Sequence, residues 1–472
     1  MIRHVNLKNF KAWREFDIEL GPRITGLFGT NSSGKSSLIQ FLLMLKETKN
    51  NPDRNIVLDF GKSGGVINLG DFGDVIHRND KSLKLEWHMS WDRMEQPWSA
   101  SDPDSGDDEI QFEYKEVSIQ SVVEMANPEE SKSLKTQSMR YTMMNEDTGE
   151  ETTYGIEPNP ERKSGFRFFR AEKLTTSDNK SPLQVEIDEG PIKTHLFPSQ
   201  AGFLMGLGDI GSPSMLPSDL AKDYEKLMDR IFYLGPLRDY PHRQYNWSGG
   251  SPTDVGARGE STINAILAAS ERGSAYQMKK GSRKLSFQEM VAMRIKDMGL
   301  IHSFSVSEVA EGSSIYQAKV SVDKKSPKAL LTDVGFGVSQ VLPIIVLLNH
   351  VPERSTVILE QPEIHLHPEV QSGLADAIVE IAETRDLQVI VESHSEHLLR
   401  RLQRRVADET IPADLVKLYF VSQENGEARL TDIGLNEYGE IENWPEHFFG
   451  DEMGEIAETR KAAIERKMKA EE

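Results

Sequence analysis

The sequence contains no cysteine. This absence excludes disulfides, thiol catalysis, cysteine-bound zinc and cysteine-ligated iron–sulfur clusters. Positive charge is also scarce, since 55 Lys and Arg residues stand against 75 Asp and Glu residues and the net charge is −20. A protein that coats nucleic acid with a basic surface is therefore excluded, although a local basic patch is not.

Long apolar runs are absent too. The longest, Val341 to Leu348, is interrupted by Pro343 and falls short of the length that spans a membrane. The first residues, MIRHVNLKNF, lack the charged, apolar and small segments of a signal peptide. Hydrophobic residues nevertheless make up 38% of the 472 residues, which is enough for a sizeable core. We therefore expect a folded cytoplasmic protein without a membrane partner.

A phosphate-binding motif lies near the start of the chain. Residues 29–36 read GTNSSGKS and fit the pattern G-x-x-x-x-G-K-[ST]. The motif follows an apolar strand predicted over residues 23–28 and precedes a helix predicted over residues 35–45, which is the setting it requires. Its backbone amides suit the α- and β-phosphates of ATP, Lys35 suits the β- and γ-phosphates, and Ser36 suits Mg²⁺. The residues expected to bind nucleotide here are Gly29, Asn31, Ser32, Ser33, Gly34, Lys35, Ser36 and Ser37.

Two later strands end in polar residues. The apolar strand Thr356 to Glu360 opens the run TVILEQPEIHLHP. An acid at the end of such a strand helps to hold Mg²⁺ in P-loop ATPases, so Ser36 and Glu360 are the predicted metal ligands. The strand Leu387 to Glu392 runs into SHSEHLL. His394 is a candidate to contact the γ-phosphate, and an ordinary surface histidine is the alternative.

The order of predicted elements indicates how the chain is organised. Strands alternate with helices in the final third, which favours a parallel sheet. The segment 83–217 is polar, with short β-like runs between Asp, Ser, Gly and Pro residues. We predict an α/β fold with four segments, namely the P-loop part of an ATPase head over 1–82, an inserted β-rich arm over 83–217, the rest of the head over 218–450 and a charged helix over 451–472.

Taken in this order, the motifs resemble the ABC-type ATPase heads of the SMC, RecF and OLD-like families. The runs VNLKNFKAW and VGFGVSQVLPII agree with this resemblance. The sequence is most similar to short bacterial OLD-like ATPases of anti-phage defence operons, such as the ATPase subunits of Septu- and PARIS-like systems. The resemblance covers residues 1–75 and 230–450 and implies an ABC-type P-loop head with a mixed sheet that binds ATP and Mg²⁺.

The resemblance also implies that two heads share ATP. In the family, a signature motif caps the γ-phosphate held by the neighbouring subunit, and residues 332–340 occupy its place here. Gly335 and Gly337 match the motif, but its serine is absent, and Ser339 and Gln340 are the candidates to replace it. A glycine-rich turn before a helix is the alternative. We expect a homo-oligomer, either an ATP-sandwiched dimer or a larger assembly.

One departure from the family concerns hydrolysis. The family pattern Asp-Glu-Pro-Glu stands here as Glu360-Gln361-Pro362-Glu363, which puts an amide at the base position. An amide orients water but accepts a proton poorly. We assign the base to Glu363, with Glu360 as the alternative and Gln361 as a residue that orients water, and His394 completes the predicted catalytic set. Slow hydrolysis is expected, because phosphoryl transfer depends mainly on positioning and charge.

Other polar residues have two interpretations each. Arg238, in YLGPLRDYP, either holds a nucleotide-dependent interface or supports a Pro-rich turn. A second group of side chains could form a transition-metal site. The family resemblance already accounts for the presence of these residues, so the metal site is the alternative interpretation. That group consists of Glu363, His365, His367, His394 and His397.

Nucleic acid is a possible partner at three basic stretches. Residues 162–173 interleave arginines with phenylalanines, and residues 279–284 and 400–405 are rich in Lys or Arg. Solvated surface charge is the alternative at each of them, and the acidic chain counts against strong DNA binding.

Two functions follow from the motifs. The first is an ATPase subunit of a prokaryotic anti-phage complex, acting as a nucleotide-gated sensor or scaffold. The residues after Ser395 leave no room for the Toprim nuclease that OLD proteins often carry, so we expect the effector to be a separate protein such as a nuclease. The alternative is a RecF-like repair ATPase that clamps DNA when ATP drives dimerisation. A transporter ATPase would have a cleaner signature motif.

Overall fold

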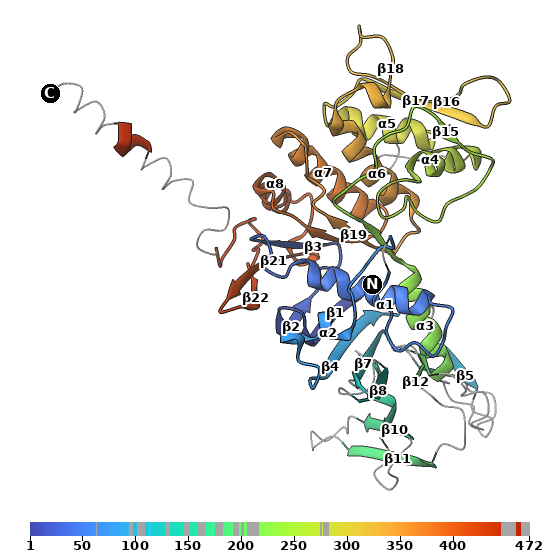
Figure 1. The fold of residues 1–472 in the computed structure, drawn as a ribbon, viewed down its shortest axis with the longest axis vertical. Helices are drawn as coiled ribbons and strands as arrows, with labels where there is room; N and C mark the ends of the chain where they lie inside the picture. The colour runs from blue at the N-terminus through green and yellow to red at the C-terminus, as the bar shows by residue number, and fades with distance from the viewer. Residues whose placement is uncertain are drawn as a thin grey trace.

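A computed structural model shows two large sheets with helices packed around them (Figure 1). The structure describes a large part of the 472 residues, with gaps mainly between 94 and 216 and at the C-terminal end. The described ranges are 1–62, 64–93, 98–101, 109–112, 114–127, 133–145, 149, 151–158, 166–174, 183–191, 198–199, 203–204, 217–273, 276, 283–444 and 459–463. Side chains are not described in residues 98–101, 109–112, 166–204 and 217–219.

The six-stranded sheet carries the nucleotide motifs, and its order is β14-β19-β20-β3-β21-β22. Its strands are β3 (Ile24–Gly29), β14 (Ile231–Leu234), β19 (Thr356–Glu360), β20 (Gln388–Glu392), β21 (Val416–Glu424) and β22 (Glu427–Asp432). Neighbouring strands are parallel from β14 to β21, and only β21 and β22 are antiparallel. The predicted α/β class with a mixed sheet is therefore confirmed.

The central strands β3, β19 and β20 are buried on both faces, as expected of a parallel sheet. Val357 and Leu359 of β19 belong to one apolar core, whereas Ile358 between them belongs to the other. Both cores are continuous across the sheet. Successive side chains alternate between the faces of a strand, so an uninterrupted apolar run becomes a strand with helices or a second sheet on each side.

The second large sheet is antiparallel and has eight strands, in the order β11-β10-β9-β8-β7-β4-β1-β2. Their bounds are β1 (Ile2–Phe10), β2 (Trp13–Glu19), β4 (Leu85–Asp92), β7 (Glu116–Met125), β8 (Leu134–Met144), β9 (Glu151–Pro158), β10 (Phe166–Leu174) and β11 (Leu183–Pro191). Strand β4 pairs with β1 on one side and β7 on the other. The strands within the segment that we predict to be a β-rich arm thus continue the sheet begun by β1 and β2.

The helices divide between the two cores. The main helices are α1 (Ser36–Asn50), α3 (Pro217–Asp229), α4 (Thr262–Glu271), α5 (Phe287–Asp297), α6 (Phe336–His350), α7 (Pro368–Thr384) and α8 (Glu396–Ala407). Helices α6, α7 and α8 lie on one side of the parallel sheet, with α4 and α5 packed against α6, while α1 and α3 lie between the other face of the sheet and the antiparallel sheet (Figure 1). Among the described residues, no helix is long and apolar enough to cross a membrane.

Short elements complete the described chain. They are α2 (Phe72–Val75), η1 (His77–Asn79), η2 (Leu331–Asp333), η3 (Ala413–Leu415), β5 (Trp98–Ser101), β6 (Glu109–Phe112), β12 (Pro198–Ser199), β13 (Phe203–Leu204), β15 (Tyr245–Asn246), β16 (Ser303–Glu308), β17 (Ile315–Ser321) and β18 (Ala329–Leu330). Most of the predicted charged helix over 451–472 lies outside the described residues, and 459–463 within it are helical.

Candidate functional site

The phosphate-binding loop joins the central strand β3 to helix α1, as the motif predicts. Gly29 has φ 138° and Gly34 has φ 104°, conformations that a side chain rarely adopts. A Cβ atom at Gly29 would lie 2.1 Å from the Val421 carbonyl oxygen, and one at Gly34 would lie 2.9 Å from Nε1 of Trp13. The same Trp13 nitrogen donates to the Gly34 carbonyl at 3.1 Å. The loop therefore depends on both glycines and on the packing of strand β2.

Lys35 lies at the base of this loop and is only 4% exposed. Its ammonium donates to the carbonyls of Thr30 at 2.6 Å and Gly29 at 3.1 Å. Burial lowers the pKa of Lys35, while the nearby carboxylates of Glu392 and Glu363 raise it. A buried cation held by two main-chain carbonyls is positioned to bind an anion at the N-terminus of α1, where helix amides add further positive potential.

The loop borders an open cavity of about 570 Å³. Of the residues predicted to bind nucleotide from the P-loop, all but Gly29 line it, together with Gln361 and His394. The complete lining is Lys11, Ala12, Asn31, Ser32, Ser33, Gly34, Lys35, Ser36, Ser37, Gln40, Gln361, Glu392 and His394. The structure thus brings residues from three distant parts of the sequence to one cavity.

Four lining residues are not among the predicted site residues, namely Lys11, Ala12, Gln40 and Glu392. Lys11 follows β1, and its ammonium donates to Oε1 of Gln40 on α1 at 2.5 Å. The order of the strands brings these residues to the cavity, and no local motif indicates it. For Glu392 a signal existed, because it is the last residue of an apolar strand, as Glu360 is.

Glu392 belongs to β20, which lies between the P-loop strand and β19. Its side chain is 4% exposed. The Ser36 hydroxyl donates a hydrogen bond to the Glu392 carboxylate, and the ammonium of Lys35 is close enough to interact with it electrostatically. Burial, the largest influence, raises the pKa of Glu392 above its ordinary range. Glu392 therefore links strand β20 to the hydroxyl of the P-loop.

Glu360 lies one strand further from the P-loop and is paired with Glu392 in the sheet register. Its Oε2 accepts a hydrogen bond from the Tyr233 hydroxyl at 2.7 Å. Burial and the neighbouring Glu392 carboxylate together raise the pKa of Glu360 to about 7. Glu360 is not among the residues that line the P-loop cavity. Its predicted role as a magnesium ligand stays a prediction.

A strained turn follows β19. Gln361 has φ 42°, a left-handed conformation that is uncommon for residues other than glycine, and its N–H donates to the Glu392 carbonyl at 2.8 Å. Arg238 holds the turn from the other side, because its guanidinium donates to the carbonyls of Gln361 at 3.2 Å and Glu360 at 3.4 Å. Arg238 is 8% exposed, and burial lowers its pKa to about 10.

These contacts favour the interpretation in which Arg238 has a structural role in its own chain over the one in which it holds a nucleotide-dependent interface. The guanidinium also donates to the Pro236 carbonyl at 3.3 Å, so its hydrogen bonds go to main-chain groups of its own subunit. Arg238 thus positions the residues that follow β19.

Glu363 and His394 meet across the strand ends. The His394 amide donates to Oε1 of Glu363 at 2.7 Å. Burial raises the pKa of Glu363, and Oε2 of the same group has no hydrogen-bond partner among the described residues. The His394 imidazole hydrogen-bonds to the Gly29 backbone, and burial and Lys35 lower its pKa. The base assignment to Glu363 and the γ-phosphate contact of His394 stay predictions.

The predicted signature residues lie at the start of α6, outside the P-loop cavity. Gly335 is the N-cap of that helix, and Phe336 after it is 52% exposed. Ser339 is buried, and its hydroxyl donates to the Phe336 carbonyl at 2.8 Å. Gln340 is also buried, and its Oε1 has no partner among the described residues. Gly337 packs near Leu300, where a Cβ atom would lie 3.1 Å from a methyl group.

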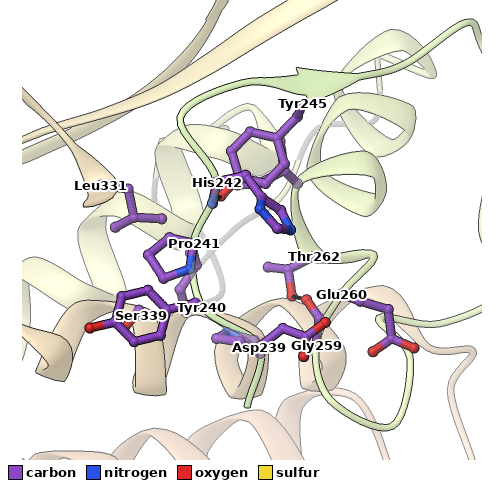
Figure 2. Close-up of a pocket in the computed structure, with 13 residues that line it drawn as sticks. Asp239, Tyr240, Pro241, His242, Tyr245, Gly259, Glu260, Thr262, Leu331 and Ser339 are labelled. Carbon is purple, nitrogen blue, oxygen red and sulfur yellow. Dashed lines mark hydrogen bonds between the residues drawn. The ribbon is translucent and has the colours of Figure 1, made fainter. Parts of the chain in front are cut away.

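A second pocket lies beside the signature stretch (Figure 2). Ser339 from α6 borders it, together with residues of the loop that follows Arg238. Tyr240, in that loop, packs edge-on against the exposed ring of Phe336, with ring centroids 5.2 Å apart. The signature stretch and the loop after Arg238 therefore form one surface that carries exposed aromatic side chains.

The residues at the P-loop fit a magnesium ion better than a transition metal. Within the described ranges, no group of three or more His, Asp or Glu side chains is arranged to hold a metal. His367 instead caps α7, where it accepts from the Glu369 amide at 3.4 Å. Ser36 and the buried Glu392 carboxylate offer oxygen atoms, which Mg²⁺ prefers, and Mg²⁺ commonly takes only one or two carboxylates from a protein.

The basic residues of α8 are largely neutralised. Arg401 pairs with Asp376 at 2.7 Å, and Arg405 pairs with the same carboxylate at 2.7 Å. Arg400 lies 4.7 Å from the centre of the Trp444 ring. Part of the basic stretch 162–173, and residues 279–282 of the second, lie outside the described residues. The described contacts of the α8 arginines are thus with other residues of the chain, as expected of side chains with a structural role.

Comparison with known families gives two matches. The profile described as AAA ATPase domain matches residues 1–183 and 277–399, which is more than half of the chain. A second profile, described as protein of unknown function (DUF3696), matches residues 411–458. The first match includes the P-loop, α6, β19 and β20.

Individual relatives are more distant. The chain is 32% identical over 69 residues to the DNA replication and repair protein RecF of Crocosphaera subtropica (strain ATCC 51142 / BH68), a match that covers 14% of this chain and 18% of RecF. An SMC head bound to the C-winged helix domain of ScpA has a TM-score of 0.41 at 11% identity, covering 92% of this chain and 98% of that one. The SMC head domain from Thermotoga maritima has a TM-score of 0.38 at 12% identity, covering 92% and 99%.

Proposed function

The chain belongs to the AAA ATPase domain family, and from this premise we propose that it binds ATP–Mg²⁺ and hydrolyses it slowly while two copies share the nucleotide. The proposal rests on one observation, which is that the phosphate loop and the predicted signature residues lie at separate places in a single copy. The phosphate loop borders its own cavity, whereas the predicted signature residues at the start of α6 lie outside it. A triphosphate held by Lys35 would therefore need a second copy to supply the cap.

The residues that would act on ATP have distinct tasks. Lys35 and the loop amides bind the phosphates, and Ser36 with a nearby carboxylate holds Mg²⁺. The ion would neutralise charge that develops on the phosphates. Gln361 lines the cavity and is placed to orient a water molecule, while Glu363 is the candidate to take its proton.

Slow turnover follows from this arrangement. Among the described residues of the turn that directly follows β19, Gln361 alone lines the cavity, and its side chain is an amide. The neighbouring carboxylates do not line it, since Glu360 accepts from Tyr233 and Oε1 of Glu363 accepts from the His394 amide. Purified protein should therefore bind ATP with Mg²⁺ and hydrolyse it in a slow steady state. Turnover of many ATP molecules per second by homogeneous protein would contradict this part of the proposal.

We further propose that the ATPase is a sensor or scaffold of an anti-phage complex and controls a separate effector, of which a nuclease is the expected kind. The resemblance to short OLD-like ATPases supports this role. The test is purification from the native host. A second protein that copurifies in a nucleotide-dependent manner is expected, and recovery of this chain alone, with and without ATP, would count against the proposal.

A RecF-like role is the second candidate, and the stretch of 69 residues that is 32% identical to RecF favours it. In that case ATP would drive two copies to close around DNA. The net charge of −20 and the paired arginines of α8 weigh against strong DNA binding. A binding assay with duplex DNA at several salt concentrations, with and without ATP, separates the two roles. ATP-dependent, salt-sensitive affinity for duplex would favour the clamp.

A further inference from the structure

The carboxylate that accepts a hydrogen bond from the Ser36 hydroxyl of the P-loop comes from β20, not from β19. In the parallel sheet β20 lies directly beside the P-loop strand β3, and β19 is the next strand outward. The register pairs Glu392 with Leu27 of β3 on one side and with Glu360 of β19 on the other. The strand order alone therefore places Glu392 one strand closer to the phosphate loop than Glu360.

The side chain of Glu392 is turned toward the cavity. It lines the cavity with Lys35 and Ser36, although the residue as a whole is only 4% exposed. One carboxylate oxygen is available to the Ser36 hydroxyl, and the other, Oε2, has no hydrogen-bond partner in the described part of the chain. A buried carboxylate oxygen without a partner is costly, unless a cation or water completes its contacts.

The other two acids of this region differ from Glu392 in their contacts. Glu360 accepts from Tyr233 at 2.7 Å, and Oε1 of Glu363 accepts from the His394 amide at 2.7 Å, while Oε2 of Glu363 has no hydrogen-bond partner among the described residues. Neither residue lines the cavity. Of the three acids, Glu392 is the one that lines the cavity.

We propose that Glu392, together with Ser36, is the carboxylate that holds the magnesium ion of bound ATP, in the place that the strand-end pattern assigns to Glu360. This inference rests on the proposed function, since the ion arrives with the nucleotide. Mg²⁺ binds oxygen ligands and usually takes one or two carboxylates from a protein, with phosphate and water filling its other positions. The Ser36 hydroxyl and the open oxygen of Glu392 provide such a pair next to the phosphate loop.

The experiment compares ATP binding with Mg²⁺ and with a chelator in full-length protein. Glu392→Gln keeps the size of the side chain and removes its charge. We expect the variant to lose most of the gain in ATP affinity that Mg²⁺ gives the wild type, about 10- to 100-fold, the range observed when groups that support a metal ligand are replaced. Affinity in the chelator should stay equal or rise, because a negative charge near the phosphates has gone.

Glu360→Gln is the matched control, as it makes the same change one strand away. It should keep the Mg²⁺-dependent gain. Ser36→Ala should lose the gain as Glu392→Gln does, and combining the two should add little, because both would act through one ion. Mn²⁺ provides a second readout, since the electron paramagnetic resonance signal of unbound Mn²⁺ in the presence of ATP should be larger with Glu392→Gln than with the wild type and should match the wild type with Glu360→Gln.

The outcomes separate this inference from the proposed function. If the wild type binds ATP with a Mg²⁺-dependent gain and Glu392→Gln retains that gain, the inference is wrong and the function stands. The same holds if Glu360→Gln is the variant that loses it. If the wild type has no affinity for ATP with Mg²⁺, the proposed function itself fails. Matching thermal melting curves establish that each variant is folded, and Ser36→Ala, at a half-exposed position, tests the site if Glu392→Gln does not fold.

Discussion

The phosphate cavity and the signature surface differ in almost every physical respect. The cavity has a buried cation at its base, main-chain carbonyls that hold this cation, and a buried carboxylate at its wall. The signature surface, which we define as Gly335 to Gln340 with the loop after Arg238, presents exposed side chains such as Phe336 and Tyr240. The two also differ in exposure, since Lys35 and Glu392 of the cavity are each 4% exposed, whereas Phe336 is 52% exposed.

This difference indicates which of the two regions can function in a single copy of the protein. The groups of the cavity are already positioned, so a single copy should bind the phosphates with little rearrangement. The signature surface has exposed apolar area that another protein surface would bury. We therefore expect nucleotide binding to survive in the monomer and nucleotide-dependent assembly to need the signature surface.

The largest effect should come from the cavity. Lys35→Ala removes the buried cation, and we expect ATP affinity to fall about 100-fold, because hydrogen bonds from charged donors contribute up to about 3 kcal/mol. Isothermal titration calorimetry measures it. Lys11→Ala, at the edge of the same cavity, is the control that should lose less. An unchanged affinity in Lys35→Ala would remove the basis of the cavity assignment.

Hydrolysis provides the next test within the cavity. Glu363→Gln should lower the steady-state turnover about 100-fold without weakening ATP binding, because general bases contribute roughly that much. The reciprocal change, Gln361→Glu, puts an acid at the cavity wall and should accelerate turnover. If Glu363→Gln hydrolyses ATP as fast as the wild type, the base is another group, and Gln361→Glu then tells whether the position after β19 limits the rate.

The signature surface should respond differently. Phe336→Asp puts a charge where we expect a second copy to pack, and it should weaken ATP-dependent association about 30-fold, the effect of losing about 2 kcal/mol at a central interface residue. ATP binding by the monomer should remain. Light scattering after size-exclusion chromatography measures the mass. Val322→Asp, which is also at an exposed apolar position, should assemble normally, and a similar defect there would mean that the change acts through general solubility.

A smaller effect is expected behind the cavity. Arg238→Lys keeps the charge but loses the planar fork that contacts three carbonyls, so the free energy of unfolding should fall by about 1–3 kcal/mol. Denaturant titration measures this loss. Arg243→Lys in the same loop is exposed and should change stability by less than about 0.5 kcal/mol. Equal stability of the two variants would show that the Arg238 contacts are energetically unimportant.

The smallest effect concerns pH and lies far from both surfaces. His350 donates to the Pro252 carbonyl at 2.9 Å, and burial lowers its pKa below the ordinary value of 6.5. The unfolded chain therefore gains a proton first as the pH falls below 6.5, and the stability contributed by neutral His350 is lost there. The variant His350→Gln should not show this loss. The difference in unfolding free energy between the wild type and the variant should therefore change by at most about 1.4 kcal/mol per pH unit. Parallel pH profiles for the two proteins would contradict it.

Much of the fold could be predicted because its strands and helices have strong local signals. Residues 356–360 form the predicted apolar strand, and residues 36–50 form a helix that includes almost all of the one predicted over 35–45. Strand β14 was not predicted, since its four residues directly follow α3 and lack turn residues before them. Helix α6 includes Pro343 in its interior, where a proline usually ends a helix. Tight packing on both sides of α6 outweighs that local preference.

The site was predictable only where one motif carries the chemistry. The P-loop follows from spacing, and all of its predicted residues except Gly29 line the cavity. Glu392 ends an apolar strand as Glu360 does, but its preference over Glu360 could not be predicted, because its proximity to Ser36 depends on which strand lies beside β3. Lys11 had no signal, because its contact with Gln40 depends on where β1 ends. Chain order places β19 before β20, whereas the sheet places β20 next to the P-loop strand. Glu360, at the end of the strand with the more easily recognised pattern, therefore lies one strand further from the P-loop than Glu392.

The most direct test of shared nucleotide is the mass and nucleotide content of the wild-type protein in one sample with ATP and Mg²⁺. The account predicts a monomer without nucleotide and, with it, a particle of at least twice the mass that holds one ATP per chain. A protein that binds ATP fully and remains a monomer at every concentration tested would contradict the claim that two copies share it.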